Sequence, residues 1–224
     1  MVEDQDAWDR AAIFFLAMLR QSRPGKSVLV GSARLIRGRE DPTFVFPCQR
    51  AYRFELPGPV RDLPAAQREE VGRVVSEMPR GWGVGQLVTT LGLLQAMGRY
   101  HQRAEGTAPL RCGLATIKLR LLRGLKSVGL PLHEIASDGL IYPLDGAVAG
   151  YYHRDPVPTV PVYWLTAERI PAVRRAVSRY GRLRTTTTIA NIRGWKRGPL
   201  RWPGGNRLGR PYPGSRRPGT SEPD

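Results

Sequence analysis

The stretch from Arg111 to Pro143 constrains the fold most, because it combines a helical repeat with a turn signal. Over residues 111–128, apolar side chains recur at the three- and four-residue spacing of an amphipathic helix, with basic residues between them. Ser137-Asp138-Gly139 then joins two short apolar runs, and an Asp-Gly in this setting is a strong hairpin signal. We therefore expect a helix over 111–128 and a β-hairpin over 132–143.

Asp138 and Gly139 also have a purely structural explanation. Asp tolerates a left-handed backbone and Gly supplies positive φ, so the pair serves turns that have no chemical role. The turn alone therefore leaves two alternatives open, a functional carboxylate at the hairpin tip or a residue that only shapes the turn.

Periodicity and breaker residues predict a mixed order of other elements. Helices are expected over 4–21, 63–78, 84–102 and 166–180, and strands over 27–36, 43–47, 51–56, 147–152, 160–165 and 183–192. This order favours an α+β fold, with a mixed or antiparallel sheet and helices on one face. Residues 1–192 are expected to form one domain. The Arg/Gly/Pro-rich tail, residues 193–224, has too little apolar surface to fold alone and is expected to be disordered.

The composition is strongly basic, with 35 Lys and Arg against 19 Asp and Glu, a formal net charge of +16 and a pI near 10.9. Such a chain attracts polyanions, because neutralising phosphates releases condensed counterions. The tail interleaves Trp and Tyr with Arg, which suits stacking on single-stranded bases. We therefore expect nucleic-acid contact, with DNA rather than RNA, and the candidate residues are Lys118, Arg123, Lys126, Arg174, Arg175, Arg193, Trp195, Lys196, Arg197, Arg201 and Trp202. An Arg-rich coding bias without any partner is the alternative explanation.

Other residue patterns exclude several classes of protein. Cys48 and Cys112 form neither a disulfide framework nor a CxxC site, and the three histidines lack zinc-ligand spacing. The apolar run AAIFFLAML is nine residues long, too short to span a bilayer, and acidic residues precede it where a signal peptide is basic. We expect a cytoplasmic protein without a membrane segment.

Two short motifs could bring carboxylates together. Asp41 stands at the start of the run Asp41–Pro47, which reads DPTFVFP, and Asp138 stands at the tip of the expected hairpin. Two-metal phosphoryl-transfer sites need carboxylates on neighbouring strands to bridge their divalent cations. The run Asp41–Pro47 resembles the Asp-x-x-Ser-Leu-Tyr-Pro motif in the palm of family B DNA polymerases, particularly protein-primed and plasmid-type members. Ser137 and Asp138 are similar to the Thr-Asp of that family's Tyr-x-Asp-Thr-Asp-Ser motif.

The resemblance covers residues 31–143 and implies a reduced, palm-like nucleotidyltransferase of the DNA-directed DNA polymerase kind. It implies Asp41 and Asp138 as catalytic residues and as ligands of Mg²⁺. Ala136 stands where the family has the first Asp of its second motif, and the intervening nucleotide-binding helix motif is not found. The alternative is a non-enzymatic basic protein that binds DNA or RNA, an accessory factor of a plasmid, phage or mobile element, and the sequence leaves open whether the chain is an enzyme.

Overall fold

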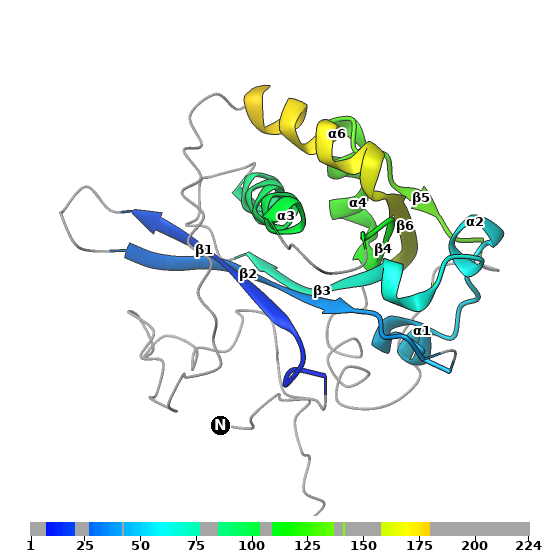
Figure 1. Ribbon diagram of the computed structural model, residues 1–224. Coiled ribbons are helices and arrows are strands. Elements are labelled where there is room, and N and C mark those ends of the chain that lie inside the picture. The colour runs from blue at the N-terminus through cyan, green and yellow to red at the C-terminus, as the bar shows by residue number, and fades with distance from the viewer. Residues whose placement is uncertain are drawn as a thin grey trace, which may run out of the picture. The chain divides into compact units, whose positions relative to one another are not determined.

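The computed structural model describes residues 8–20, 27–41, 43–76, 85–103, 109–136, 141 and 158–179, all within the compact unit Met1–Asn191. Its centre is a six-stranded sheet in the order β1-β2-β3-β4-β6-β5 (Figure 1). The strands are β1 (Ile13–Arg20), β2 (Ser27–Arg37), β3 (Arg68–Ser76), β4 (Cys112–Lys118), β5 (His133–Glu134) and β6 (Thr159–Leu165). The helices are α1 (Pro47–Tyr52), α2 (Gly58–Arg61), α3 (Gly85–Arg103), α4 (Leu119–Ser127) and α6 (Thr166–Arg179), with a 3₁₀ turn at Ala65–Gln67.

The sheet is mixed. β1, β2 and β3 are antiparallel neighbours, as are β4, β6 and β5, and the two groups meet where β3 lies parallel to β4. A parallel pair needs a crossover connection, and α3 lies in that connection. The pairing joins only Arg68–Glu70 to Cys112–Leu114, although β3 continues to Ser76 and β4 to Lys118. The two strands therefore separate after their first three residues within the described part of the chain.

Each face of the sheet has its own apolar core. Alternate residues of a strand face opposite sides, so Ala33 and Leu35 of β2 lie in the core under α3, α4 and α6, while Ile36 lies in the other. The short helices α1 and α2 pack on that second face, where Leu114 of β4 is buried with them. In Figure 1 the three longer helices lie along one side of the sheet. The predicted α+β class, with a mixed sheet, is confirmed.

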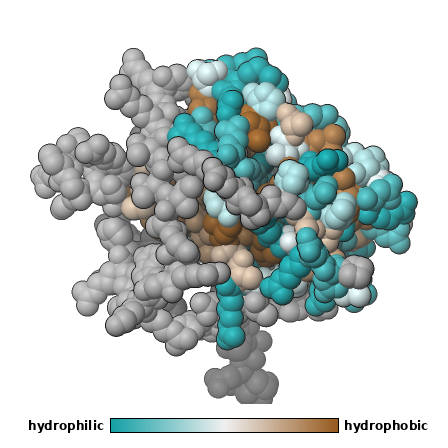
Figure 2. Space-filling model, viewed as in Figure 1, coloured by the Kyte–Doolittle hydropathy of each residue, from teal (hydrophilic) through white to brown (hydrophobic). Residues whose placement is uncertain are grey.

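The outer surface of the longer helices is polar. Figure 2 shows hydrophilic side chains gathered over α6, in the same view as Figure 1. Among the described helices, none has the length and apolar character that crossing a bilayer requires.

Four elements match the sequence closely: β2, α3, β6 and α6 occupy the ranges predicted as strand, helix, strand and helix. Two predicted helices are wrong. Residues 4–21 contain the strand β1, and residues 63–78 contain the strand β3. In both, pairing to a neighbouring strand decides the structure, because sheet contacts override weak local propensity.

The predicted helix over 111–128 is half correct. Its first part is β4, held between β3 and β6, and only Leu119–Ser127 is helical. The predicted strands over 43–47 and 51–56 are also wrong. Pro47 opens α1 at a position where a missing N–H costs nothing, and the Gln49 Oε1 atom accepts the Phe46 N–H at 3.2 Å. α1 ends at Arg53, which adopts a left-handed backbone.

The predicted hairpin over 132–143 is described only in part. β5 pairs with β6, and Ile141 forms an isolated bridge with Thr159. The tip with Asp138 and the strands predicted over 147–152 and 183–192 lie outside the described residues, as does the tail from residue 193. The boundary at residue 192 and the disorder of the tail stay predictions.

Candidate functional site

β3 carries two consecutive glutamates at the point where it separates from β4. Glu69 and Glu70 pair with Gly113 and Leu114, the last residues of the parallel register. Both side chains are buried, and because neighbouring residues of a strand face opposite sides, each enters a different core. Buried carboxylates are rare unless they are paired or hydrogen-bonded, so the partners of each glutamate define two charged networks.

Glu70 faces α1. Its Oε2 atom accepts the backbone N–H of Cys48 at 2.9 Å, in the first turn of that helix. Burial, and then the negative charge of Glu70, raise the pKa of the Cys48 thiol well above its usual range. A Cβ atom at Gly72 would lie 3.3 Å from Glu70 Oε1 and 3.9 Å from Arg34 Nη2. Because Gly72 has no side chain, both polar groups can lie close to the backbone at this position.

Arg34 forms an ion pair on the same face of the sheet as Glu70. Its Nη1 atom lies 2.8 Å from Asp9 Oδ1, and Arg73 Nη1 lies 3.3 Å from Asp9 Oδ2. The Arg34 and Asp9 side chains are 5% and 8% exposed, which makes this pair a buried one. We call Asp9, Arg34, Glu70 and Arg73 the Asp9 cluster.

The backbone at Arg73 is strained. Arg73 has a φ of 49° and lies in β3 opposite the register shift between Ser32 and Arg34 of β2. A bulge of this kind re-aims a side chain, and a left-handed non-glycine residue costs free energy that the surrounding structure must offset. The bulge turns Arg73 to Asp9.

Aromatic rings stand beside the Asp9 cluster. Trp8, the neighbour of Asp9, contacts the Phe44 ring edge-to-face with centroids 5.5 Å apart, and Phe44 contacts Phe46 in the same way at 4.9 Å. Aromatic faces attract cations, and carboxylates attract them more strongly. The sheet face under α1 thus combines acids, guanidinium groups and aromatic rings near one strand separation.

Glu69 faces the longer helices. His101 Nε2 of α3 lies 2.7 Å from Glu69 Oε2, and Arg169 Nη2 of α6 lies 3.4 Å from Glu69 Oε1 and 3.2 Å from His101 Nδ1. The Arg169 guanidinium stands 5.2 Å from the centroid of Trp164, and burial lowers the pKa of Arg169. We call Glu69, His101 and Arg169 the Glu69 network. It ties β3 to both long helices.

Of the two residues predicted as a catalytic and metal-binding pair, the structure describes one, Asp41. Asp41 is exposed, and its Oδ1 atom accepts the Thr43 N–H at 2.8 Å and the Thr43 hydroxyl at 2.7 Å. These two hydrogen bonds lower the pKa of Asp41, which makes it a turn residue ahead of α1. Asp138 lies outside the described residues. No group of three or more His, Cys, Asp or Glu able to hold a metal ion occurs in the described ranges.

The basic residues predicted to bind nucleic acid lie on separate elements. Lys118 ends β4, Arg123 and Lys126 lie exposed on α4, and Arg174 and Arg175 lie exposed on α6. Lys126 pairs with Glu134 of β5, and Arg174 donates to Gln102 Oε1 of α3 at 2.9 Å. The tail residues Arg193, Trp195, Lys196, Arg197, Arg201 and Trp202 fall outside the described structure.

The residues of both networks were missed by the sequence analysis. One signal was available: Arg34 stands inside the apolar strand sequence VLVGSARLIR, where a charge needs a partner. Glu69 and Glu70 gave no such signal while their segment was read as a helix. Their partners Cys48, His101 and Arg169 are distant in the chain, and no local pattern connects them.

No protein-family model and no curated protein sequence matches the chain. The solved structures similar to it are acyl-homoserine lactone synthases. The CoA-dependent synthase MesI is 20% identical, with 78% of this chain and 73% of MesI covered and a TM-score of 0.45. The CoA-dependent synthase BjaI, solved with SAM and isopentyl-CoA, is 17% identical over 84% of this chain and 72% of BjaI, with a TM-score of 0.48. TofI, in a ternary complex with an inhibitor and MTA, is 16% identical over 76% and 74%, with a TM-score of 0.47.

These findings correct the expectations of a polymerase palm. The resemblance to family B DNA polymerases was wrong, because the similar structures are synthases that act on small molecules. The predicted nucleic-acid partner, whether for a polymerase or for an accessory protein, was wrong for the same reason. The predicted Mg²⁺ cofactor was wrong too, because the compounds named in those structures are SAM, isopentyl-CoA and MTA. The assignment of Asp41 and Asp138 as site residues stays a prediction.

Proposed function

We propose that this chain is an acyltransferase that moves an acyl group from a CoA thioester to the amine of SAM (S-adenosylmethionine). The observation that carries the proposal is the separation of β3 from β4 directly beyond Glu70. In open sheets, ligands favour the carboxyl ends of parallel strands, where the chain leaves the sheet in different directions. The solved synthases serve only to choose the compounds with which the proposal is tested.

The separated strands suit the donor. From Val71 onward, β3 pairs with β2 along one edge. Among the described residues, its other edge no longer pairs with β4 beyond Glu70. An extended ligand that carries amides can bind such an edge as an added strand. The pantetheine arm of CoA is extended and contains two amides. Its phosphates also suit a chain whose formal charge is +16.

The Asp9 cluster suits the acceptor. SAM bears an ammonium group and a sulfonium group, and both positive charges favour carboxylates and aromatic faces. Glu70 and the rings of Trp8 and Phe44 lie on the face of the sheet that also holds Arg34 and Arg73. Arg73, whose side chain is 29% exposed, can bind the carboxylate of the same substrate while Arg34 holds Asp9.

The chemistry needs an unprotonated amine next to the thioester carbonyl. The ammonium gives a proton to the Glu70 carboxylate, the nitrogen attacks the carbonyl carbon, and the C–S bond breaks. The nitrogen loses a second proton as it becomes an amide, and the leaving CoA thiolate takes up that proton. Glu70 then releases the first proton to solvent, so atoms and charge balance. Holding both substrates beside Glu70 supplies most of the rate advantage, because it converts a bimolecular encounter into a reaction within one complex. The two cysteines are free and buried, which supports a reducing, cytoplasmic setting.

The test measures CoA thiol release from isopentyl-CoA and from straight-chain acyl-CoA thioesters, with and without SAM. Thiol release is expected only with both substrates. Glu70→Gln is expected to lower kcat/KM by about 10²- to 10⁴-fold, the range of general-base effects. Glu55→Gln is the matched control, because Glu55 is exposed, and it should stay within about twofold of wild type. Circular dichroism checks that both variants are folded.

Two results refute the proposal. The first is no SAM-dependent thiol release from any of the thioesters, together with no binding of CoA by calorimetry. The second is equal activity of wild type, Glu70→Gln and Glu55→Gln, which removes the Asp9 cluster from the reaction.

A further inference from the structure

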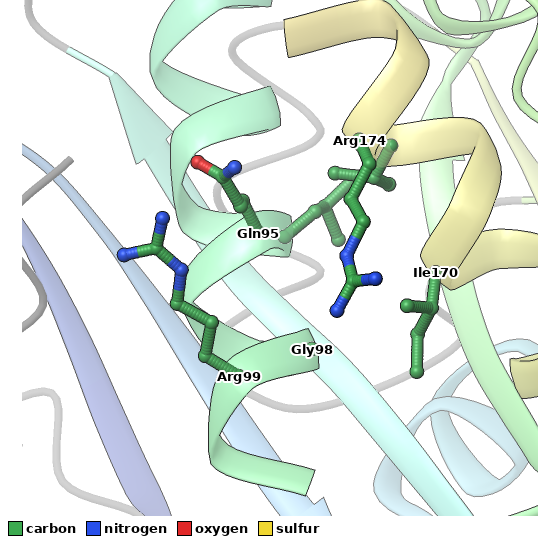
Figure 3. Close-up of a pocket in the computed structure, with 7 residues that line it drawn as sticks. Gln95, Gly98, Arg99, Ile170 and Arg174 are labelled. Atoms are coloured by element: carbon green, nitrogen blue, oxygen red, sulfur yellow. The ribbon is translucent and has the colours of Figure 1, made fainter. Parts of the chain in front are cut away.

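A cavity of about 260 Å³ lies between α3 and α6, on the helix-covered face of the sheet (Figure 3). Both helices supply its walls, and the lining residues are Leu94, Gln95, Gly98, Arg99, Ile170, Val173 and Arg174. The Asp9 cluster lies on the other face of the sheet, so this cavity is separate from the site of the proposed acyl transfer.

The lining has a clear division of chemistry. Leu94, Ile170 and Val173 supply apolar surface, Arg174 supplies a positive charge, and the lining residues include no carboxylate. The Arg99 side chain extends from α3 away from Arg174 (Figure 3). In Figure 3 the Arg174 side chain extends from α6 toward α3 near Gly98, which has no side chain to fill the space. Gln95 and Arg99 lie side by side on α3 in the same view.

The Arg174 guanidinium is held in place. Its Nη2 atom donates to Gln102 Oε1 at 2.9 Å, one turn beyond Gly98. Buried Arg169 lies one turn before Val173, and its contacts with Glu69 and His101 fix α6 against α3. A guanidinium carries five N–H donors in a planar fork. The hydrogen bond to Gln102 orients the Arg174 group, and the other N–H donors keep the planar arrangement that binds a carboxylate.

We propose that this cavity binds a small organic monocarboxylate with a short apolar body. The carboxylate contacts the guanidinium of Arg174, and the apolar body covers Leu94, Ile170 and Val173. At about 30 Å³ per water-sized group, the cavity holds eight or nine such groups. That size matches hexanoate and heptanoate, which have eight and nine non-hydrogen atoms, and octanoate, with ten, marks its upper limit. A free acid of this class differs from the CoA thioester of the proposed function in having an ionised carboxylate at the reacting carbon.

The test is calorimetric titration of the full chain with hexanoate and octanoate, and with inorganic phosphate at the same ionic strength. Arg174→Gln should weaken octanoate binding at least about tenfold, since a charge-assisted hydrogen bond is lost. Arg175→Gln removes the same charge from an exposed neighbour and should leave the affinity within about twofold.

Gly98→Ala probes the volume of the cavity. Its new methyl group would lie 3.6 Å from Ile170 Cγ1, an ordinary contact, so the fold tolerates it while the cavity shrinks. Octanoate binding should weaken more than hexanoate binding. The assignment is overturned if no carboxylate binds, if phosphate binds as well as octanoate, or if Arg174→Gln and Arg175→Gln weaken binding equally. Glu70→Gln should leave octanoate binding unchanged, which separates this site from the proposed acyl-transfer site.

Discussion

Replacing Arg169 by Met should destabilise the fold more than any surface substitution. Arg169 is 1% exposed and Glu69 is fully buried, so the variant leaves a carboxylate without its cation in an apolar core. Removing one partner of a buried ion pair costs about 3–5 kcal/mol. The figure of about 3–5 kcal/mol includes the loss of the contact between the Arg169 guanidinium and the Trp164 ring.

This cost is large against the total stability of a domain, which is about 5–15 kcal/mol. For a domain of this size each kcal/mol corresponds to about 2–4 °C in Tm, so Arg169→Met should melt about 6–20 °C lower than wild type. Urea unfolding followed by circular dichroism gives the free energy of unfolding directly. Arg175→Met is the control, since it removes an exposed charge from the same helix and should change stability by less than about 0.5 kcal/mol.

The double variant Glu69→Met with Arg169→Met separates charge from packing. It removes both charges, so only His101 keeps a polar group without its partner, at a cost of about 1–3 kcal/mol. The double variant should therefore be more stable than Arg169→Met alone. This reasoning fails if the free energy of unfolding of Arg169→Met stays within about 1 kcal/mol of wild type. It also fails if the effects of Glu69→Met and Arg169→Met simply add in the double variant, because the Glu69 network is then not a coupled buried ion pair.

Four further variants test local packing, thiol ionisation and backbone strain. Gly113→Ala should lower the free energy of unfolding in urea by about 1–3 kcal/mol, because its methyl group would overlap the buried Trp164 ring. Gly124→Ala, within helix α4, should raise it by about 0.5–1 kcal/mol, because its Cβ would lie 3.9 Å from the nearest side chain. Equal effects of the two variants would contradict this packing. Burial raises the pKa of the Cys112 thiol to about 12. Its contribution to the free energy of unfolding is therefore fully present below the unfolded pKa of about 8.5 and is lost as pH rises toward 12. Between pH 7 and 10 wild type should therefore lose about 2 kcal/mol more than Cys112→Ala, and parallel pH profiles would count against this. Arg53→Gly should raise Tm, since a φ of 50° costs roughly 1 kcal/mol in a non-glycine residue, and an unchanged or lower Tm would argue against strain at this position.

The sequence predicted those elements whose local pattern and tertiary setting agree. α3 and α6 have long helical periodicity, and β2 and β6 are apolar runs rich in strand-forming residues. The prediction failed where two periods fit the same residues. In 111–128 the spacing of apolar residues suits a helix throughout, but the first part lies between β3 and β6 and forms a strand. No local signal marks residue 119 as the boundary.

The site was harder to predict than the fold, because its contacts are remote in sequence. Arg34 and Asp9 are 25 residues apart, and Arg169 and His101 are 68 apart. The motif approach selected Asp41, whose carboxylate is satisfied within two residues by Thr43. Carboxylates that serve a site must stay available to distant partners, whereas a turn uses them locally.

The net charge was misleading about the partner, because the prediction of nucleic-acid binding rested on it. A sum of +16 counts every arginine equally, but Arg34 and Arg73 are committed to Asp9, and Arg169 to Glu69. Arg34 and Arg169 are buried with their acids and add little to the surface field that a polyanion meets, whereas Arg73 is 29% exposed. The described basic residues predicted to bind nucleic acid lie on β4, α4 and α6. The proposed function instead assigns the phosphates to one small ligand, CoA, and the edge of β3 beyond Glu70 to its amides.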